Sequence, residues 1–370
     1  MKEPCLPGWE IIELIGEGSF GKVYKIERDV LGKVEQAALK VITIPQNKSE
    51  VANLISEGYD TVSINEHYKE YLMEIVNEYS VMSELRGNSN IVDCNDLHYV
   101  EHEDGVGWDI YIRMELLTPM TDKIDADNSV EQTIQLGIDM CNALILCKKH
   151  NIVHRDIKPQ NIFISKHGQY KLGDFGIAKV VERATTGTKT GTFRYMAPEV
   201  YNNQPYGGTV DIYSLGLVMY WMLNQKRTPF LPLPPEIPTV SMEEEARKRR
   251  MNGDEIPQPI NGTEDLKKIV CKACEFDVNK RYQSPEEMLQ DLKKLQNLDE
   301  TVVIPPIPPK PKKKNNFVIW LGIVAIIVAL VIWIATRPKE TITESVPIVS
   351  EETIQKDALD ILKDNNITED

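Results

Sequence analysis

The chain has 370 residues, of which 42% are hydrophobic and 26% are charged, so most of it can bury a core and bulk disorder is excluded. Its formal net charge of -14 excludes nucleic acid as the main partner, because binding to a phosphate backbone needs Lys and Arg clustered on one face. The six cysteines are scattered over a chain too long to need disulfide bonds, so we expect reduced thiols in a cytosolic compartment.

After an N-terminal tail over residues 1–8, residues 9–298 are predicted to form one domain with two parts. Up to about residue 120, short β-rich runs (IIELIG, KVYKIE, QAALKVITI and DIYIRMEL) surround one helical stretch near residues 66–86. The following residues carry mostly helical patterns, such as VEQTIQLGIDMCNALILCKKH, whose apolar residues recur at three- and four-residue spacing. The sequence therefore predicts an α+β fold with a small β-rich lobe and a larger helical lobe.

The first motif is G-E-G-S-F-G-K-V, which contains Gly16, Glu17, Gly18, Gly21 and Val23 and lies between two apolar runs. Glycines at this spacing let a hairpin fold its backbone N–H groups over phosphates. A Rossmann dinucleotide site would need the motif to open a helix, whereas the strand-like run KVYKIE follows here.

Further motifs follow in a fixed order. The β-run A-L-K-V holds Lys40, whose ammonium can neutralise phosphate oxygens, although a lone exposed lysine would be the ordinary reading without the glycine loop. Then come H-R-D-I-K-P-Q-N at residues 154–161, D-F-G at 174–176 and A-P-E at 197–199.

In order and spacing these five motifs resemble the eukaryotic-type protein kinase superfamily over residues 9–298. The resemblance implies the two-lobed protein kinase fold and a protein serine/threonine kinase that transfers the γ-phosphoryl group of ATP to Ser and Thr hydroxyls of proteins. It also implies ATP as the phosphoryl donor, with Mg²⁺ or Mn²⁺.

The resemblance assigns the catalytic roles residue by residue. Asp156 accepts or orients the substrate hydroxyl proton, and Lys158 stabilises the transferring phosphoryl group. Asn161 and Asp174 bind the metal ion, and Lys40 neutralises phosphates. Phosphoryl transfer needs charge neutralisation and in-line positioning, which carboxylates, amides and cations provide.

The family also pairs the strand lysine with a glutamate of the helix that follows. Three glutamates are candidates, Glu74, Glu78 and Glu84, and the spacing to the later N-I-V run at Asn90 favours Glu78.

A nucleotide base site is implied around the run DIYIRMELL. Met114 resembles the gatekeeper, and Glu115 and Leu117 would offer backbone groups to adenine, although ordinary strand packing explains the same residues. The resemblance places the adenine ring between Val23, Ala38 and Phe163.

Regulation is expected in the threonine-rich stretch A-T-T-G-T-K-T-G-T, because Arg155 in active members of the family pairs with a phosphorylated residue of this loop. Thr188 is at the family position, and Thr192 would contact the pair Asp156 and Lys158. Simple loop flexibility is the alternative reading. The other candidate phosphorylation sites are Thr185, Thr186 and Thr190.

Several residues of the helical half are interpreted as structural. The resemblance implies an ion pair between Glu199 and Arg281 and a brace of the catalytic loop by Asp211. The run EEEARKRR at residues 243–250 places acids and bases as a helix dipole prefers. The C-x-x-C pattern at residues 271–274 has no second pair at zinc-site spacing.

The C-terminal part is predicted to attach the domain to a membrane. Residues 299–316 form a Pro/Lys-rich juxtamembrane linker, the 19 uncharged residues 317–335 form a transmembrane helix, and residues 336–370 form a short extracytoplasmic tail. Four lysines precede the span, so the positive-inside rule leaves the kinase domain in the cytoplasm and the C-terminus outside the plasma membrane. This arrangement resembles the bacterial transmembrane Ser/Thr kinases.

Two alternatives to an active kinase are a pseudokinase and a receptor. A pseudokinase would lack a catalytic group, yet Lys40, Asp156, Asn161 and Asp174 are all present. A receptor that mainly senses the exterior would need more than the 35 residues of the tail. The expected partners are protein substrates, the membrane and a second copy of the chain for trans-autophosphorylation.

Overall fold

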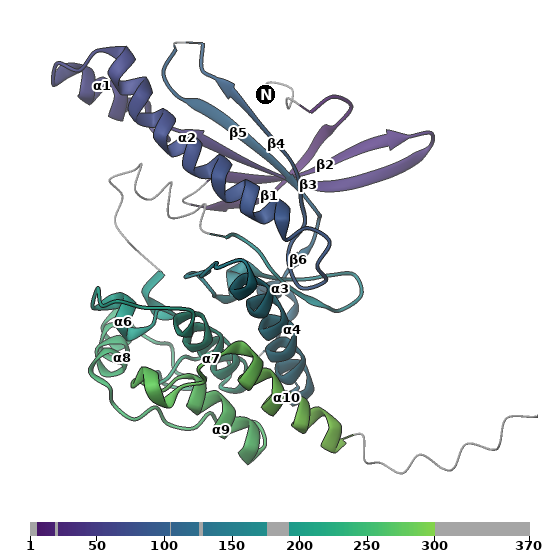
Figure 1. Ribbon diagram of the computed structural model, residues 1–370, viewed down its shortest axis with the longest axis vertical. Helices are drawn as coiled ribbons and strands as arrows, with labels where there is room; N and C mark the ends of the chain where they lie inside the picture. The colour runs from purple at the N-terminus through teal and green to yellow at the C-terminus, as the bar shows by residue number, and fades with distance from the viewer. Residues whose placement is uncertain (1–5, 19–20, 104, 126–128, 176–191, 300–370) are drawn as a thin grey trace, which may run out of the picture. The chain divides into compact units, whose positions relative to one another are not determined.

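The computed structural model describes residues 6–18, 21–103, 105–125, 129–175 and 192–299 (Figure 1). The chain divides into two units, Met1–Val303 and Ile304–Asp370, and the described residues all belong to the first. Within these ranges no helix is both long and apolar enough to cross a membrane. The predicted span, the tail and all of the predicted linker except Asp299 lie outside the described residues.

The small lobe is built on a five-stranded antiparallel sheet with the strand order β1-β2-β3-β5-β4. All four β-rich runs predicted from the sequence form strands, and a fifth strand, β4, completes the sheet. The central strand β3 pairs with both β2 and β5. The strands are β1 (Glu10–Gly18), β2 (Gly21–Val30), β3 (Lys33–Ile44), β4 (Cys94–Glu101) and β5 (Trp108–Met114).

Two helices lie between β3 and β4, where one helical stretch was predicted. Helix α1 (Lys48–Ser56) and helix α2 (Thr61–Glu84) occupy most of the polar connection at residues 45–93, between β3 and β4. Their starts are fixed by Asn47 and Asp60, whose side chains accept backbone N–H bonds of the first turn. Helix α2 runs along the sheet (Figure 1) and packs against β4. It buries five residues at helical spacing, namely Ile64, Tyr68, Leu72, Ile75 and Met82.

The predicted N-terminal tail contains residues that belong to the folded lobe. Leu6 and Trp9 are buried in a small cluster with Ile26, Ala37 and Leu39 of the sheet. The guanidinium of Arg28 also lies over the Trp9 ring, 4.7 Å from its centre. The folded region therefore begins before residue 9, because packing of Leu6 requires the backbone up to it.

The large lobe is helical, as predicted. Helix α7 (Thr209–Leu223) is buried on all sides. Helix α4 (Val130–Lys149) begins with a capping box at Ser129 and Gln132 and packs against α7 and α10 (Pro285–Asp299). A three-stranded sheet with the order β6-β7-β8 consists of β6 (Thr118–Pro119), β7 (Ile162–Ile164) and β8 (Tyr170–Leu172). The helices are α3 (Met120–Lys123), α4 (Val130–Lys149), α6 (Pro198–Tyr201), α7 (Thr209–Leu223), α8 (Val240–Asn252), α9 (Glu264–Ala273) and α10 (Pro285–Asp299).

Candidate active site

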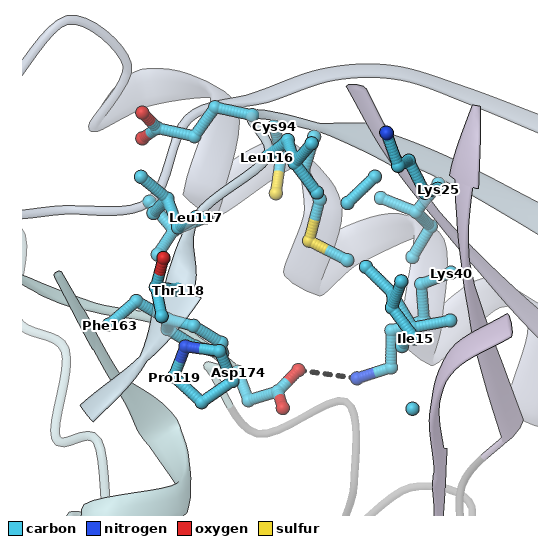
Figure 2. Close-up of a pocket in the computed structure, with 18 of the residues that line it drawn as sticks. Ile15, Lys25, Lys40, Cys94, Leu116, Leu117, Thr118, Pro119, Phe163 and Asp174 are labelled. Carbon is cyan, nitrogen blue, oxygen red and sulfur yellow. Dashed lines mark hydrogen bonds and ion pairs between the residues drawn. The ribbon is translucent and has the colours of Figure 1, made fainter. Parts of the chain in front are cut away.

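A cavity of about 580 Å³ is lined by residues of the small sheet, the β5–β6 connection and the strands of the large lobe (Figure 2). The structure brings nine of the residues predicted from the sequence to its wall. These are Gly16, Val23, Ala38, Lys40, Met114, Glu115, Leu117, Phe163 and Asp174.

The glycine motif forms the β1–β2 hairpin, except for residues 19–20, which lie outside the described ranges. Gly21 has φ +131°, and a Cβ there would lie 2.1 Å from the carbonyl oxygen of Val41, so only glycine fits. Gly18 pairs with Gly21 across the hairpin, and neither it nor Glu17 is among the cavity-lining residues. The motif thus brings backbone close to the cavity at Gly16 and a side chain at Val23.

Strand register brings the base-site candidates together. Ala38 on β3 lies opposite Met114 on β5, and Met114 lies opposite Cys94 on β4. Val23 reaches the cavity from β2 and Phe163 from β7, in the other lobe. The segment Glu115–Pro119, which connects the two lobes and is called the hinge below, closes the remaining side.

Some lining residues were not predicted. Ile112 precedes Met114 by two residues and therefore shares its face of β5, a signal that alternation in the strand contains. Met82 and Cys94 reach the cavity only through tertiary packing of α2 and β4, which sequence spacing does not reveal. Burial raises the pKa of the Cys94 thiol to about 12, so this group is neutral at physiological pH.

Lys40 forms an ion pair with Asp174, drawn as a dashed line in Figure 2. The pairing of Lys40 with Glu78 stays a prediction. The Lys40 ammonium is buried and needs a carboxylate partner, and Asp174 supplies one from the large lobe. Glu78 lies one helical turn before the cavity-lining Met82, whereas Glu84 lies 3.5 Å from His150.

Asp174 is held in its ionised form. Burial by itself raises the pKa of this carboxyl, but the Lys40 ammonium beside it outweighs burial, and the pKa is lowered from its usual value. Its backbone has φ +54°, which is uncommon for a residue other than glycine. The result is a carboxylate available at the cavity wall at neutral pH.

Three predicted catalytic residues form one cluster in the segment after α4. The Lys158 ammonium lies 2.8 Å from Asp156 Oδ2, and the Asn161 side-chain N–H group donates to the same oxygen at 2.8 Å. Asn161 also donates to the Asp156 carbonyl at 2.8 Å, which fixes the turn between them. One carboxylate oxygen of the buried Asp156 is therefore held by a cation and an amide.

Residues 154–161, called the catalytic segment, are hydrogen-bonded to Asp211 of α7, as predicted. Its carboxylate accepts the backbone N–H groups of His154 at 2.8 Å and Arg155 at 2.7 Å. Arg155 has φ +66°, so two bonds from a buried carboxylate hold an uncommon backbone conformation. The predicted brace is confirmed.

The donor set fits a divalent cation. Gly173 N–H donates to the Asn161 carbonyl at 2.9 Å, which brings Asn161 next to the residue before Asp174. Both side-chain hydrogen bonds of Asn161 use its nitrogen, so its Oδ1 and the Asp174 carboxylate are oxygen ligands of the kind that Mg²⁺ prefers. One or two such ligands beside substrate phosphates are typical of Mg²⁺ sites.

The segment after residue 191 is held from the large lobe. Ser214 on α7 donates to the Tyr195 carbonyl at 2.8 Å. The predicted ion pair is confirmed, because Arg281 donates to both oxygens of Glu199 at 2.6 Å and 2.9 Å, with both side chains buried. Four threonine candidates, Thr185, Thr186, Thr188 and Thr190, lie outside the described residues, as does the side chain of Thr192.

A comparison with protein families matches residues 9–292 to the model described as the protein kinase domain. A probable serine/threonine-protein kinase of Clostridium perfringens is 30% identical over 303 residues, which cover 80% of this chain and 39% of the relative. The probable serine/threonine-protein kinase PknB of Lactococcus lactis is 28% identical over 302 residues, covering 79% and 42%. Serine/threonine-protein kinase 36 of Pongo abelii is 34% identical over 216 residues, covering 57% and 14%. The chain thus spans less than half the length of each of these relatives.

Proposed function

The chain belongs to the protein kinase family, and from this premise we propose that it transfers the γ-phosphoryl group of ATP to serine and threonine hydroxyls of proteins. One observation carries the proposal: Asp156 is held by Lys158 and Asn161 in a segment joined to the cavity through Gly173 and Asp174. A general base, a phosphate-directed cation and metal-ligand candidates are thereby brought into one site.

Each residue of the site has its own role in the proposed reaction. The Asp156 carboxylate orients the protein hydroxyl and accepts its proton while the oxygen attacks the γ-phosphorus and the bond to the β-phosphate oxygen breaks. Lys158 offsets negative charge on the transferring group, and Lys40 offsets charge on the remaining phosphates. Asn161 and Asp174 are the residues that would hold Mg²⁺, which would supply positive charge to neutralise the phosphates.

The test uses the purified full-length chain with labelled ATP, Mg²⁺ and a generic Ser/Thr protein substrate. We expect Asp156→Asn to lower the rate by at least about 100-fold, because the general base is lost while its hydrogen-bonding shape is kept. Lys166→Gln, a change on the surface loop between β7 and β8, is the control and should leave the rate unchanged. Equal labelling by the wild type and Asp156→Asn would contradict the proposed function.

We further propose a location for this activity. The uncharged segment 317–335 and the lysines before it support a single membrane span with the kinase domain in the cytoplasm. The C-terminal tail would then lie outside the plasma membrane, where a reporter enzyme fused after Asp370 tests the orientation.

A further inference from the structure

A partly buried ion pair joins the hinge to the strand that leads to Asp174. Lys171 on β8 is 7% exposed, and its ammonium lies 2.5 Å from Glu115 Oε1. The same oxygen accepts the backbone N–H of Asp93 at 2.8 Å, and Lys171 also donates to the Ile91 carbonyl at 3.2 Å. The pair therefore ties together the hinge, β8 and the connection between α2 and β4.

Backbone bonds fix the register of β8 at the same place. Leu172 N–H donates to the Asn90 carbonyl at 2.9 Å, and Val92 N–H donates to the Leu172 carbonyl at 3.0 Å. The Asn90 side chain also donates to the Tyr170 carbonyl at 3.1 Å. Because Leu172 precedes Asp174 by two residues, the position of that carboxylate depends on this register.

The ion pair connects one part of the cavity wall, the hinge, to the strand β8, which leads to another part of the wall at Asp174. Glu115 and Asp174 both line the cavity, while Lys171 does not. A buried charge that loses its partner is strongly unfavourable, so the hinge and β8 cannot separate without breaking this contact. The two parts of the wall are consequently held at a fixed separation.

We propose that Lys171 and Glu115 are positioning residues that set the affinity for the nucleotide, a role that rests on the proposed kinase function. They hold the hinge, where the base would bind, relative to Asp174, where the metal ion and phosphates would bind. The Lys171 ammonium touches neither the catalytic cluster nor the cavity. Loss of the pair should therefore weaken nucleotide binding more than it slows the chemical step.

The experiment compares full-length wild-type chain with Lys171→Met, Glu115→Gln and the double variant. KM for ATP and kcat are measured, together with Kd for a fluorescent ATP analogue without protein substrate. We expect each single variant to raise KM and Kd about tenfold and to change kcat less than about threefold. The double variant should be no worse than either single variant, because the two side chains act as one unit.

The matched control is Arg113→Met. Arg113 lies one residue before Met114, and its guanidinium is 2.5 Å from Asp96 Oδ2, but this pair joins two strands of one sheet rather than two lobes. It should leave KM and Kd unchanged. Equal increases in the control, unchanged KM and Kd in folded Lys171→Met, or a fall in kcat alone would overturn the role. A wild type that binds the analogue without transferring phosphate would instead count against the kinase function.

Discussion

At the scale of single residues, His154 links the catalytic segment to the residues before Asp174 through both ring nitrogens. Its Nε2–H donates to the Gly173 carbonyl at 3.0 Å, and its Nδ1 accepts the Asp156 backbone N–H at 3.3 Å. This pattern requires the neutral imidazole, since a protonated ring has no acceptor. Burial lowers the pKa of His154 below its usual value. The nearby carboxylates would raise this pKa, but the effect of burial is larger.

The pH dependence of stability follows from this lowered pKa. Below about pH 6.5 the unfolded chain binds a proton at His154 that the folded chain resists, so the stability present above that pH is lost as the pH falls. We expect wild-type melting temperature to drop more between pH 7.5 and 5.5 than that of His154→Gln, whose amide keeps a donor and an acceptor. Equal drops, measured by differential scanning fluorimetry, would show that His154 contributes nothing to this window.

The catalytic residues were predictable from the sequence where they lie in one short motif. The Asp156, Lys158 and Asn161 cluster lies within one short segment, so sequence proximity brought the right groups together. The ion pair of Lys40 with Asp174 was not predictable from sequence spacing, because 134 positions separate the two residues. Lys171 was missed for a similar reason: its partner Glu115 is 56 positions distant.

At the scale of elements, the charged residues of α8 stabilise the helix and also contact neighbouring parts of the large lobe. The run at residues 243–250 lies within the helix α8, as the dipole interpretation predicted. Gly253 caps the end of this helix, and its φ of +85° suits a left-handed cap. One face of this helix also contacts α6 and the segment before it. Glu243 pairs with Arg194, and the guanidinium of Arg247 lies 5.5 Å and 5.7 Å from the ring centres of Phe193 and Tyr201.

This face of α8 should affect the protein substrate rather than ATP. The contacted segment follows the predicted activation loop, and the family resemblance places Thr192 beside Asp156. We expect Arg247→Ala to raise KM for a peptide substrate about fivefold, since cation–π contacts at exposed sites contribute on the order of 1 kcal/mol, while KM for ATP stays constant.

Lys248→Ala is the matched control for that change. Lys248 is the next residue of the helix, and its ammonium lies 3.9 Å from Glu244 rather than near the contacted segment. Steady-state kinetics with each substrate varied in turn separates the two effects. A parallel rise of both KM values in Arg247→Ala would show general loosening of the lobe.

Element types were more predictable than element limits. The β-rich runs all became strands, because their apolar alternation reflects a sheet with a buried face. The polar connection after β3 was harder to interpret, since α1 and the first turns of α2 are stabilised by Asn47, Asp60 and packing of Ile64 and Tyr68. The capping residues Asn47 and Asp60 indicate where helices can start in this connection. Whether the helices form there depends on tertiary contacts, which the sequence does not reveal.

At the scale of the whole molecule, membrane attachment would change how copies of the chain meet. The described residues place Arg155 beside Asp156, with its guanidinium 5.4 Å from the centre of the Tyr206 ring. The resemblance pairs such an arginine with a phosphorylated threonine of the activation loop, and each phosphate adds about -1.5 to -2 charges. Confinement of two copies to one bilayer raises their effective concentration and so favours phosphorylation of one copy by the other.

The corresponding prediction concerns the full-length chain reconstituted into lipid vesicles at several surface densities. The early rate of autophosphorylation per molecule should rise with density, because the reaction needs two copies, and flotation with the vesicles should verify that the chain is embedded. Replacing Thr185, Thr186, Thr188 and Thr190 together with alanine should abolish the later acceleration of substrate phosphorylation, since no loop phosphate can then form. A rate per molecule that stays constant with density would indicate reaction within one copy. Full acceleration in the fourfold variant would mean that the activating phosphate lies elsewhere in the chain.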